Sequence, residues 1–347
     1  MARVYLDYNA TTPLRDEARA AMRAAMDHFG NPSSVHAEGR AAKSIIEKAR
    51  AQVSSALGAD GADIVFTSSA TESAALACAG RTLASARIEH DAVLSWTTGD
   101  LAVDALGAVE VLEPKQSALQ LANSETGVMQ RLPDGLALCD MTQAFGKLPL
   151  AFNWSGADMA LISAHKLGGP KGIGALVIKR GLDVPAQIKG GGQEMGRRSG
   201  TENIIGIAGF GAAAEAAQRD LDGGLWNKVE KLRNILESAI AERAKRTIFV
   251  GKDTERLPNT SCLLTPGWKG ETQVMQMDLA GFAISAGSAC SSGKLKASGV
   301  LMAMGYSEAD AACAIRVSLG PDTTEQEGLR FADAWLAQHY KFRARAA

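Results

Sequence analysis

The run SAHKLGGPKGIGALVIK, from Ser163 to Lys179, contains a lysine in a position suited to chemistry. Lys166 follows an apolar run and precedes Gly168-Gly169, a pattern that predicts a strand, a tight loop and a second strand. A primary amine at the end of a strand is either a solvated loop charge or a buried group held for chemistry. This run alone favours the solvated charge, so the choice depends on what other segments bring to the same place.

Two further motifs offer groups that bind charged ligands. In SSATES, Ser69 and Glu72 fit a capping box at the start of a helix, where amide groups also bind anions. In CDMTQAFGK, Asp140 ends an apolar run and Gln143 follows it after two intervening residues. A carboxylate at the end of a strand either caps a helix or pairs with a protonated ring nitrogen. A plain structural cap explains each motif when it stands alone.

Two glycine-rich segments have the same ambiguity. GGGQEMGRRSGTEN, from Gly190 to Asn203, presents many amide groups beside two arginines, and it either grips an anion or forms a flexible loop. SAGSACSSGK places Cys290 among small polar residues, with Lys294 close in sequence. A nearby lysine favours the thiolate form, which makes Cys290 a candidate nucleophile. The alternative is an incidental exposed cysteine.

The other four cysteines, unlike Cys290, have apolar neighbours and read as small core residues. The total of five is odd and includes no CxxC pair, which argues against a disulfide framework or a structural zinc site. We therefore expect no metal site and expect thiols in a reducing compartment.

Composition narrows the function classes. The chain has 347 residues, 46% hydrophobic and 22% charged, as in an ordinary globular protein with room for more than one domain. Its formal net charge of -1 gives no reason to expect a nucleic acid or an anionic membrane as partner. No apolar stretch is long enough to span a bilayer, and the beginning, MARVYLDYNATTPL, has no apolar signal region. We expect a cytoplasmic protein.

The elements that must position these groups alternate between strands and helices. A strand, a Ser/Thr turn and a helix are predicted over residues 62–80, and buried strands over 91–96, 136–140, 158–163 and 173–179. Helices are predicted over residues 202–221 and 225–245. This alternation indicates a mostly parallel sheet covered on both faces, in which ligands bind beyond the carboxyl ends of the strands. Thr71, Asp140 and Lys166 all follow such strands.

A domain boundary is predicted near Asp222-Gly223-Gly224. Residues 13–222 then form a large domain that carries the lysine and the aspartate. Residues 1–12 and 223–347 form a smaller domain that carries the segment around Cys290.

Together these motifs resemble those of a known family. A lysine, an aspartate and a Ser/Thr helix start are what pyridoxal 5'-phosphate requires of a protein. The sequence resembles the cysteine desulfurases of the NifS and IscS kind, in the class V aminotransferase family. The runs that carry the resemblance follow the family's order from Tyr5 to about Gly320: YLDYNATTP, GNPSSVHAEGRAA, FTSSATES, IEHDAV, ANSETGV, DMTQAFGKLP, SAHKLGGPKGIGAL, GGGQEMGRRSGTEN, SAGSACSS and AIRVSLG.

The resemblance implies a fold-type-I enzyme, an α/β protein with a mostly parallel central sheet and a smaller α+β domain. It implies a homodimer whose active sites take residues from both subunits. It also implies that Lys166 bonds covalently to the cofactor and moves protons on the substrate. Asp140 would keep the ring nitrogen protonated, Gln143 would hydrogen-bond the phenolic oxygen, and His90 would stack on the ring and act as an acid or base.

The remaining roles implied by the resemblance concern the cofactor phosphate, the substrate and the sulfur. The phosphate would be held by Ala70, Thr71, Ser163 and His165, with Thr201 from the other subunit. Arg316 would bind the substrate carboxylate through its planar fork, and Asn123 would lie near the cofactor and that carboxylate. Cys290 would attack the sulfur of L-cysteine, release L-alanine and carry the sulfur as a persulfide. The persulfide would pass to an acceptor, an iron–sulfur scaffold or sulfur carrier, for iron–sulfur cluster assembly.

The sequence departs from the family in three places. The stretches 90–123 and 127–140 are short, and Ser124 stands where asparagine is common. Because the catalytic positions remain, we expect a trimmed but active enzyme with an altered outer wall of its substrate pocket. Two alternatives stay open: a selenocysteine lyase or other class V enzyme in which Cys290 is a bystander, and a non-catalytic scaffold that kept the fold.

Overall fold

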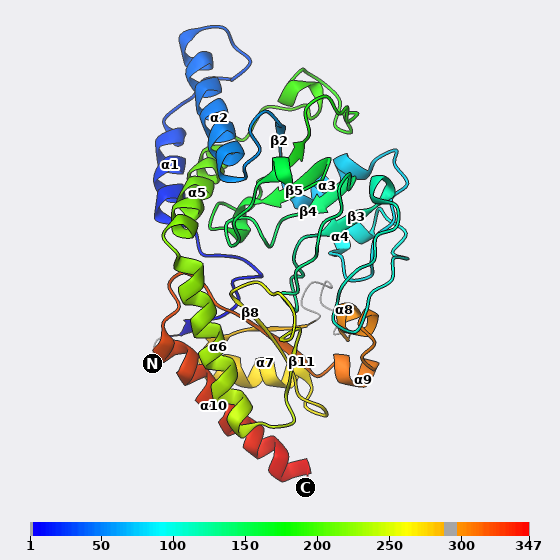
Figure 1. Ribbon diagram of the computed structural model, residues 1–347. Coiled ribbons are helices and arrows are strands. Elements are labelled where there is room, and N and C mark those ends of the chain that lie inside the picture. The colour runs from blue at the N-terminus through cyan, green and yellow to red at the C-terminus, as the bar shows by residue number, and fades with distance from the viewer. Residues whose placement is uncertain (1–2, 288–296, 347) are drawn as a thin grey trace.

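A five-stranded sheet forms the centre of the larger part of the molecule in the computed structural model, which describes residues 3–287 and 297–346 (Figure 1). Its strands lie in the order β2-β6-β5-β4-β3. They are β2 (Asp63–Thr67), β3 (Ala118–Gln120), β4 (Leu138–Asp140), β5 (Met159–Ser163) and β6 (Gly174–Ile178). Only β6 runs against its neighbours, so the sheet is mixed but most of its strands are parallel to one another.

Helices cover both faces of this sheet. On one face lie α1 (Asp16–Met26), α2 (Ala37–Ala56) and α5 (Ile204–Asp222) (Figure 1). They pack against alternate strand residues such as Ile64 and Phe66. On the other face, α3 (Ala70–Cys78) and α4 (Asp91–Leu94) pack against the intervening residues, such as Val65. The continuous burial of β5 and β6 explains why their sequences are apolar without alternation.

A second, antiparallel sheet has the order β10-β11-β8-β7. Its strands are β7 (Ile248–Val250), β8 (Thr260–Leu264), β10 (Ser285–Ala286) and β11 (Ala314–Ser318). Its core is shared with α6 (Leu225–Arg243), α7 (Gly270–Leu279) and α10 (Glu325–Ala346), while α8 (Gly299–Ala303) and α9 (Glu308–Ala311) lie near one end (Figure 1). The N-terminal strand β1 (Val4–Tyr5) pairs with β9 (Phe282–Ala283) in a separate two-stranded sheet. A bridge between Asp7 and Ser318 of β11, together with a shared apolar core, attaches the chain start to the second sheet. The division into residues 13–222 and the rest stays a prediction.

The predicted strand over residues 91–96 was wrong, because this segment begins with the short helix α4. The His90 ring caps that helix by accepting a hydrogen bond from the Ala92 amide, and Asp91 lies in its first turn. A short apolar run fits a buried strand and a buried helix equally well, and only the capping residue distinguishes them. Beyond α4, the trimmed stretch up to Ser117 forms one 3-10 turn, η1 (Pro114–Gln116), and isolated bridges such as Ala84 with Ser117.

No helix within residues 3–287 and 297–346 combines the length and the apolar character that a membrane span needs.

The packing of α5 on the sheet gives a test of this architecture. Phe210 is fully buried, and its ring meets those of Phe66 and Phe145 edge-on. We expect Phe210→Ala to lower the free energy of unfolding by about 3–5 kcal/mol, because the deletion leaves a cavity under the sheet. Urea unfolding followed by circular dichroism measures this. The control Leu279→Ala, at a position 83% exposed, should change it by less than about 0.5 kcal/mol. Equal effects of the two changes would contradict the packing described.

Candidate active site

A cavity of about 180 Å³ lies at the carboxyl ends of the parallel strands. Most of the residues predicted from motifs meet there. Its lining consists of Ser69, Ala70, Thr71, His90, Ala92, Gln120, Ala122, Ser124, Asp140, Thr142, Gln143, Ser163, His165 and Lys166. Segments distant in sequence therefore converge as the sheet topology predicts.

The helix start of α3 forms one end of the cavity. The Ser69 hydroxyl caps this helix by accepting a hydrogen bond from the Glu72 amide, as the SSATES motif predicts. Gly174, at the start of β6, lets the helix approach closely: a Cβ there would lie 2.6 Å from the Ser69 carbonyl carbon. Helix amide groups, the helix dipole and hydroxyls from Thr71 and Ser163 make this end suited to an anion.

Lys166 lies at the end of β5, in the 3-10 turn η3 (Ala164–Lys166). Its amine donates hydrogen bonds to the main-chain oxygens of Asn9 at 2.6 Å and Ala10 at 3.0 Å. The Thr12 hydroxyl donates to the Lys166 carbonyl at 2.8 Å. The lysine is therefore held in place by the N-terminal segment and is not a solvated loop charge.

Asp140 lies at the end of β4, where it accepts a hydrogen bond from the Thr142 amide at 2.8 Å. Burial raises the pKa of this carboxyl, while its hydrogen bonds with Thr142 and the charges of His90 and Lys166 oppose the rise. An enclosed carboxylate gains most from a cationic partner, such as a protonated ring nitrogen.

Two histidines line the cavity. His90 caps α4 through Nδ1, which accepts from the Ala92 amide at 3.0 Å, so the hydrogen of a neutral ring lies on Nε2. His165 Nδ1 lies 3.2 Å from the Thr11 hydroxyl. Burial, together with nearby lysines, lowers the pKa of His165 to about 4, so its ring is neutral at physiological pH. The neutral His165 ring can therefore serve as a hydrogen-bond partner without adding a charge.

Gln143 also lines the cavity, and its amide nitrogen donates to the Asn9 carbonyl at 2.9 Å. Its amide oxygen accepts from the buried amine of Lys147 at 2.8 Å. Neither Asn9 nor Lys147 is among the site residues predicted from the sequence motifs. The spacing of Lys147, one helical turn after Gln143 in QAFGK, was the available signal.

Arg316, on β11, reaches this region from the second sheet. Its guanidinium donates to Asp7 at 2.8 Å and to the Ser124 carbonyl at 3.0 Å. Its Nε is buried without a hydrogen-bond partner in the described chain. Arg316 does not line the cavity itself, but it bonds the backbone of Ser124, which does. A buried donor that lacks an acceptor suits an anionic ligand such as a carboxylate.

The Asn123 side chain lies in a tight turn next to the cavity. Its side-chain oxygen accepts hydrogen bonds from the Glu125 and Thr126 amides, and its nitrogen donates to the Ile88 carbonyl. These bonds use the amide to build a tight turn, and Asn123 is not part of the cavity lining. Ser124, the next residue, faces the cavity instead. The contact of Asn123 with cofactor or substrate that the resemblance implied stays a prediction.

Thr201 also lies outside the cavity of its own chain. It borders a separate hollow with Ser68, Gly172 and Arg198. Its implied role concerns the cavity of a second subunit and stays a prediction.

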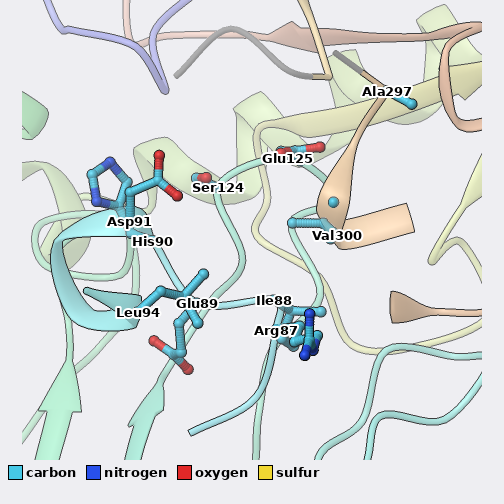
Figure 2. Close-up of a pocket in the computed structure, with 11 residues that line it drawn as sticks. Arg87, Ile88, Glu89, His90, Asp91, Leu94, Ser124, Glu125, Ala297 and Val300 are labelled. Carbon is cyan, nitrogen blue, oxygen red and sulfur yellow. The ribbon is translucent and has the colours of Figure 1, made fainter. Parts of the chain in front are cut away.

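A smaller hollow of about 120 Å³ adjoins the cavity and shares His90 and Ser124 with it (Figure 2). Glu125 lines this hollow, and its carboxyl accepts a hydrogen bond from the Ser298 hydroxyl. Burial raises the pKa of Glu125 to about 7, against the pull of that bond and of Arg316. Glu89 lies on the same wall, is more deeply buried, and has a pKa raised well above its ordinary value by burial.

Cys290 lies outside the described residues, between β10 and α8. Each of the other four cysteines, Cys78, Cys139, Cys262 and Cys313, is buried, and burial raises the pKa of its thiol. None of them is therefore activated as a nucleophile. Within the described ranges, no group of three His, Cys, Asp or Glu residues is arranged to hold a metal ion.

The cavity fits the planar aromatic phosphate that the motifs imply. A helix start lies at one end for the phosphate, and the Lys166 amine reaches the lining. The Asp140 carboxylate accepts from the Thr142 amide, and the charges of His90 and Lys166 already favour its ionised form, as a cation on a bound ring would. The orphaned Nε of Arg316 adds a donor for a substrate carboxylate nearby.

Comparison with known proteins agrees with this geometry. The family model described as aminotransferase class-V matches residues 4–100 and 99–331. The chain is 39% identical to a protein named cysteine desulfurase from Cereibacter sphaeroides, over 94% of this chain and 93% of that protein. It resembles the X-ray structure of a NifS-like protein from Rickettsia africae, with a TM-score of 0.88, 30% identity and coverage of 97% of this chain and 99% of the other. A structure described as SspA in complex with cysteine matches with a TM-score of 0.75 and 29% identity, over 92% of this chain and all of the other.

The raised pKa of Glu125 predicts a pH dependence of stability. Folding raises this pKa from 4.5 to about 7, so the folded state retains a proton that the unfolded state loses between these values. The contribution of Glu125 is therefore greatest at low pH and falls as pH rises through 7. Relative to Glu125→Gln, the parent protein should lose about 2 kcal/mol of unfolding free energy between about pH 5 and about pH 8. Chemical denaturation at several pH values measures this. Parallel profiles for the two proteins would show that this carboxyl titrates normally.

Proposed function

The chain belongs to the class V aminotransferase family and is an enzyme of its cysteine desulfurase group, and from that premise we propose that it uses pyridoxal 5'-phosphate to convert L-cysteine into L-alanine. The observation that carries this proposal is the convergence of Lys166, Asp140 and the α3 helix start on one cavity. A cofactor that needs an amine, an acid and a phosphate site would find all three there.

In the proposal the bound cofactor supplies an electron sink, and the chain supplies orientation and proton transfer. Lys166 holds the cofactor covalently and then moves a proton at the substrate α-carbon. Asp140 keeps a proton on the ring nitrogen, because its enclosed carboxylate is stabilised by a cation beside it. His90 stacks on the ring and exchanges protons through Nε2, since Nδ1 is used by the Ala92 amide. Ala70, Thr71, Ser163 and His165 orient the phosphate.

The substrate is proposed to bind with its carboxylate at Arg316. The unpartnered Nε and the hydrogen bond to the Ser124 backbone place this cation next to the cavity. Asp7 holds the guanidinium plane in position from the other side. The related protein crystallised with cysteine supports an amino acid of that size as ligand.

The sulfur step is assigned to Cys290. Its thiolate attacks the sulfur of L-cysteine, a sulfur–sulfur bond forms, and the carbon–sulfur bond breaks with its electron pair kept on the substrate carbon. Protonation of that carbon gives L-alanine, and Cys290 keeps the sulfur as a persulfide. The other four cysteines are buried and poorly suited to this role.

The destination of the sulfur and the assembly state complete the proposal. The persulfide passes to an acceptor protein, an iron–sulfur scaffold or a sulfur carrier, for iron–sulfur cluster assembly in the cytoplasm. The enzyme acts as a homodimer in which Thr201 serves the partner's phosphate site. Thr201 borders a hollow separate from the cavity of its own chain, which supports a role in the partner's site. The side chains of Phe29 and Val35, 88% and 89% accessible in one chain, support a homodimer because they are large and apolar.

The proposal predicts that the protein forms alanine from L-cysteine with a reductant and cofactor present, and that Cys290→Ala abolishes it. We expect a fall of at least about 100-fold, because no other group replaces the nucleophile. The visible absorption of the bound cofactor should remain in the variant. Amino-acid analysis of timed reactions measures the product.

Cys313→Ala is the matched control, because that thiol is buried away from the cavity and should leave turnover within about two-fold. Unchanged turnover in Cys290→Ala would instead favour a selenocysteine lyase or another class V reaction. Absence of cofactor absorption in the parent protein, even after addition of the cofactor, would favour a non-catalytic scaffold.

A further inference from the structure

Lys147 is a buried lysine that the reaction proposed above does not use. Its side chain is 2% exposed, and its amine donates hydrogen bonds to Gln143 Oε1 at 2.8 Å and Asn9 Oδ1 at 3.2 Å. Both acceptors are neutral amide oxygens. Lysines are rarely buried without an acidic partner, because an ammonium loses its hydration on burial and nothing of opposite charge compensates for the loss. We therefore expect the buried Lys147 amine to have a specific function.

The contacts of Lys147 decide which way the Gln143 amide faces. The two ends of a glutamine amide have nearly the same shape, and only hydrogen bonds select the orientation. The Lys147 amine binds the oxygen end, so the nitrogen end is left to donate. That nitrogen donates to the Asn9 carbonyl at 2.9 Å, and Gln143 borders the cavity. The second hydrogen of the nitrogen remains for a ligand.

The same network extends to Lys166 through Asn9. The Asn9 carbonyl accepts from both Gln143 and the Lys166 amine. The Asn9 side chain is fixed in turn, because its oxygen accepts from Lys147 and Asn259 and its nitrogen donates to Thr260. Lys147 therefore contacts Asn9 in two ways. It donates directly to the Asn9 side chain, and through Gln143 it is linked to the Asn9 carbonyl, which accepts from the Lys166 amine.

We propose that Lys147 is a positioning residue, which fixes the Gln143 amide with its N–H toward the cavity and so provides a hydrogen-bond donor for the phenolic oxygen of the bound cofactor. The inference rests on the function proposed above. Lys147 acts through Gln143 and does not touch the cofactor. Burial lowers the pKa of its amine well below the ordinary value, with Lys166 and Arg316 adding to the effect. Even a neutral amine keeps the two hydrogens that its two acceptors need.

The test is the pH titration of the visible absorption band of bound pyridoxal 5'-phosphate, in the absence of substrate. A donor to the phenolic oxygen stabilises its negative charge and makes the neighbouring proton easier to lose. Lys147→Met keeps the length and apolar stem of the side chain but removes the donor. We expect the midpoint of its titration to rise by about one pH unit, as for the loss of one hydrogen bond to a charged group.

The Gln143→Leu variant separates a positioning role from a direct effect of charge. If Lys147 acts through Gln143, then Gln143→Leu raises the midpoint similarly and the double variant shows no further rise. Lys171→Met is the matched control, because Lys171 is exposed and follows Lys166 in the same loop. It removes one positive charge without touching the network, and its midpoint should stay within about 0.3 units of the parent.

The inference would be overturned if the midpoint shifts of the two single variants add in the double variant. It would also be overturned if the Lys147→Met midpoint equals that of Lys171→Met. In both cases the absorption band of the parent protein would still support the proposed function. A parent protein without any such band would overturn both. If Lys147→Met does not fold, Lys147→Leu replaces it under the same criteria, because leucine also has no hydrogen-bond donor.

Discussion

The main-chain carbonyl of Asn9 accepts hydrogen bonds from the Lys166 amine and the Gln143 amide, and the geometry of the cavity depends on it. Asn9 follows β1, which pairs with β9 and shares the apolar core of the second sheet, whereas both donors follow strands of the first sheet. A nearby ion pair, between Asp7 and Arg316, fastens the same segment to β11. The N-terminal segment is therefore the link through which both sheets contribute to one site.

Burial is the second constraint on the chemistry of this region. It raises the pKa of the acids Asp140, Glu89 and Glu125, and it lowers the pKa of the bases Lys147 and His165. Each shift favours the neutral form, so these groups cost less to bury than full charges would. For Glu125 the shift brings the pKa to about 7, a value at which a carboxyl can both give and take a proton near neutral pH.

Much of the site could be predicted from the sequence, because its motifs are local. Lys166 and Asp140 each follow an apolar strand, and Ser69 begins a helix, so sheet topology brings them together without further information. The strand predicted over residues 91–96 was wrong, because a segment as short as α4 shows no periodicity that separates a helix from a strand. The sequence could not predict that Ser124, and not Asn123, borders the cavity, because hydrogen bonds within the turn decide which of the two side chains faces inward.

Asn9 and Lys147 lacked any sequence signal of comparable strength, because their importance comes from contacts between segments about 140 residues apart. Their proximity to Lys166 also suggests the most direct test of the account. The protein is incubated with pyridoxal 5'-phosphate, reduced with borohydride, digested and mapped by mass spectrometry. The account predicts a single modified lysine, Lys166. Modification at Lys147, or at exposed lysines without preference, would contradict it.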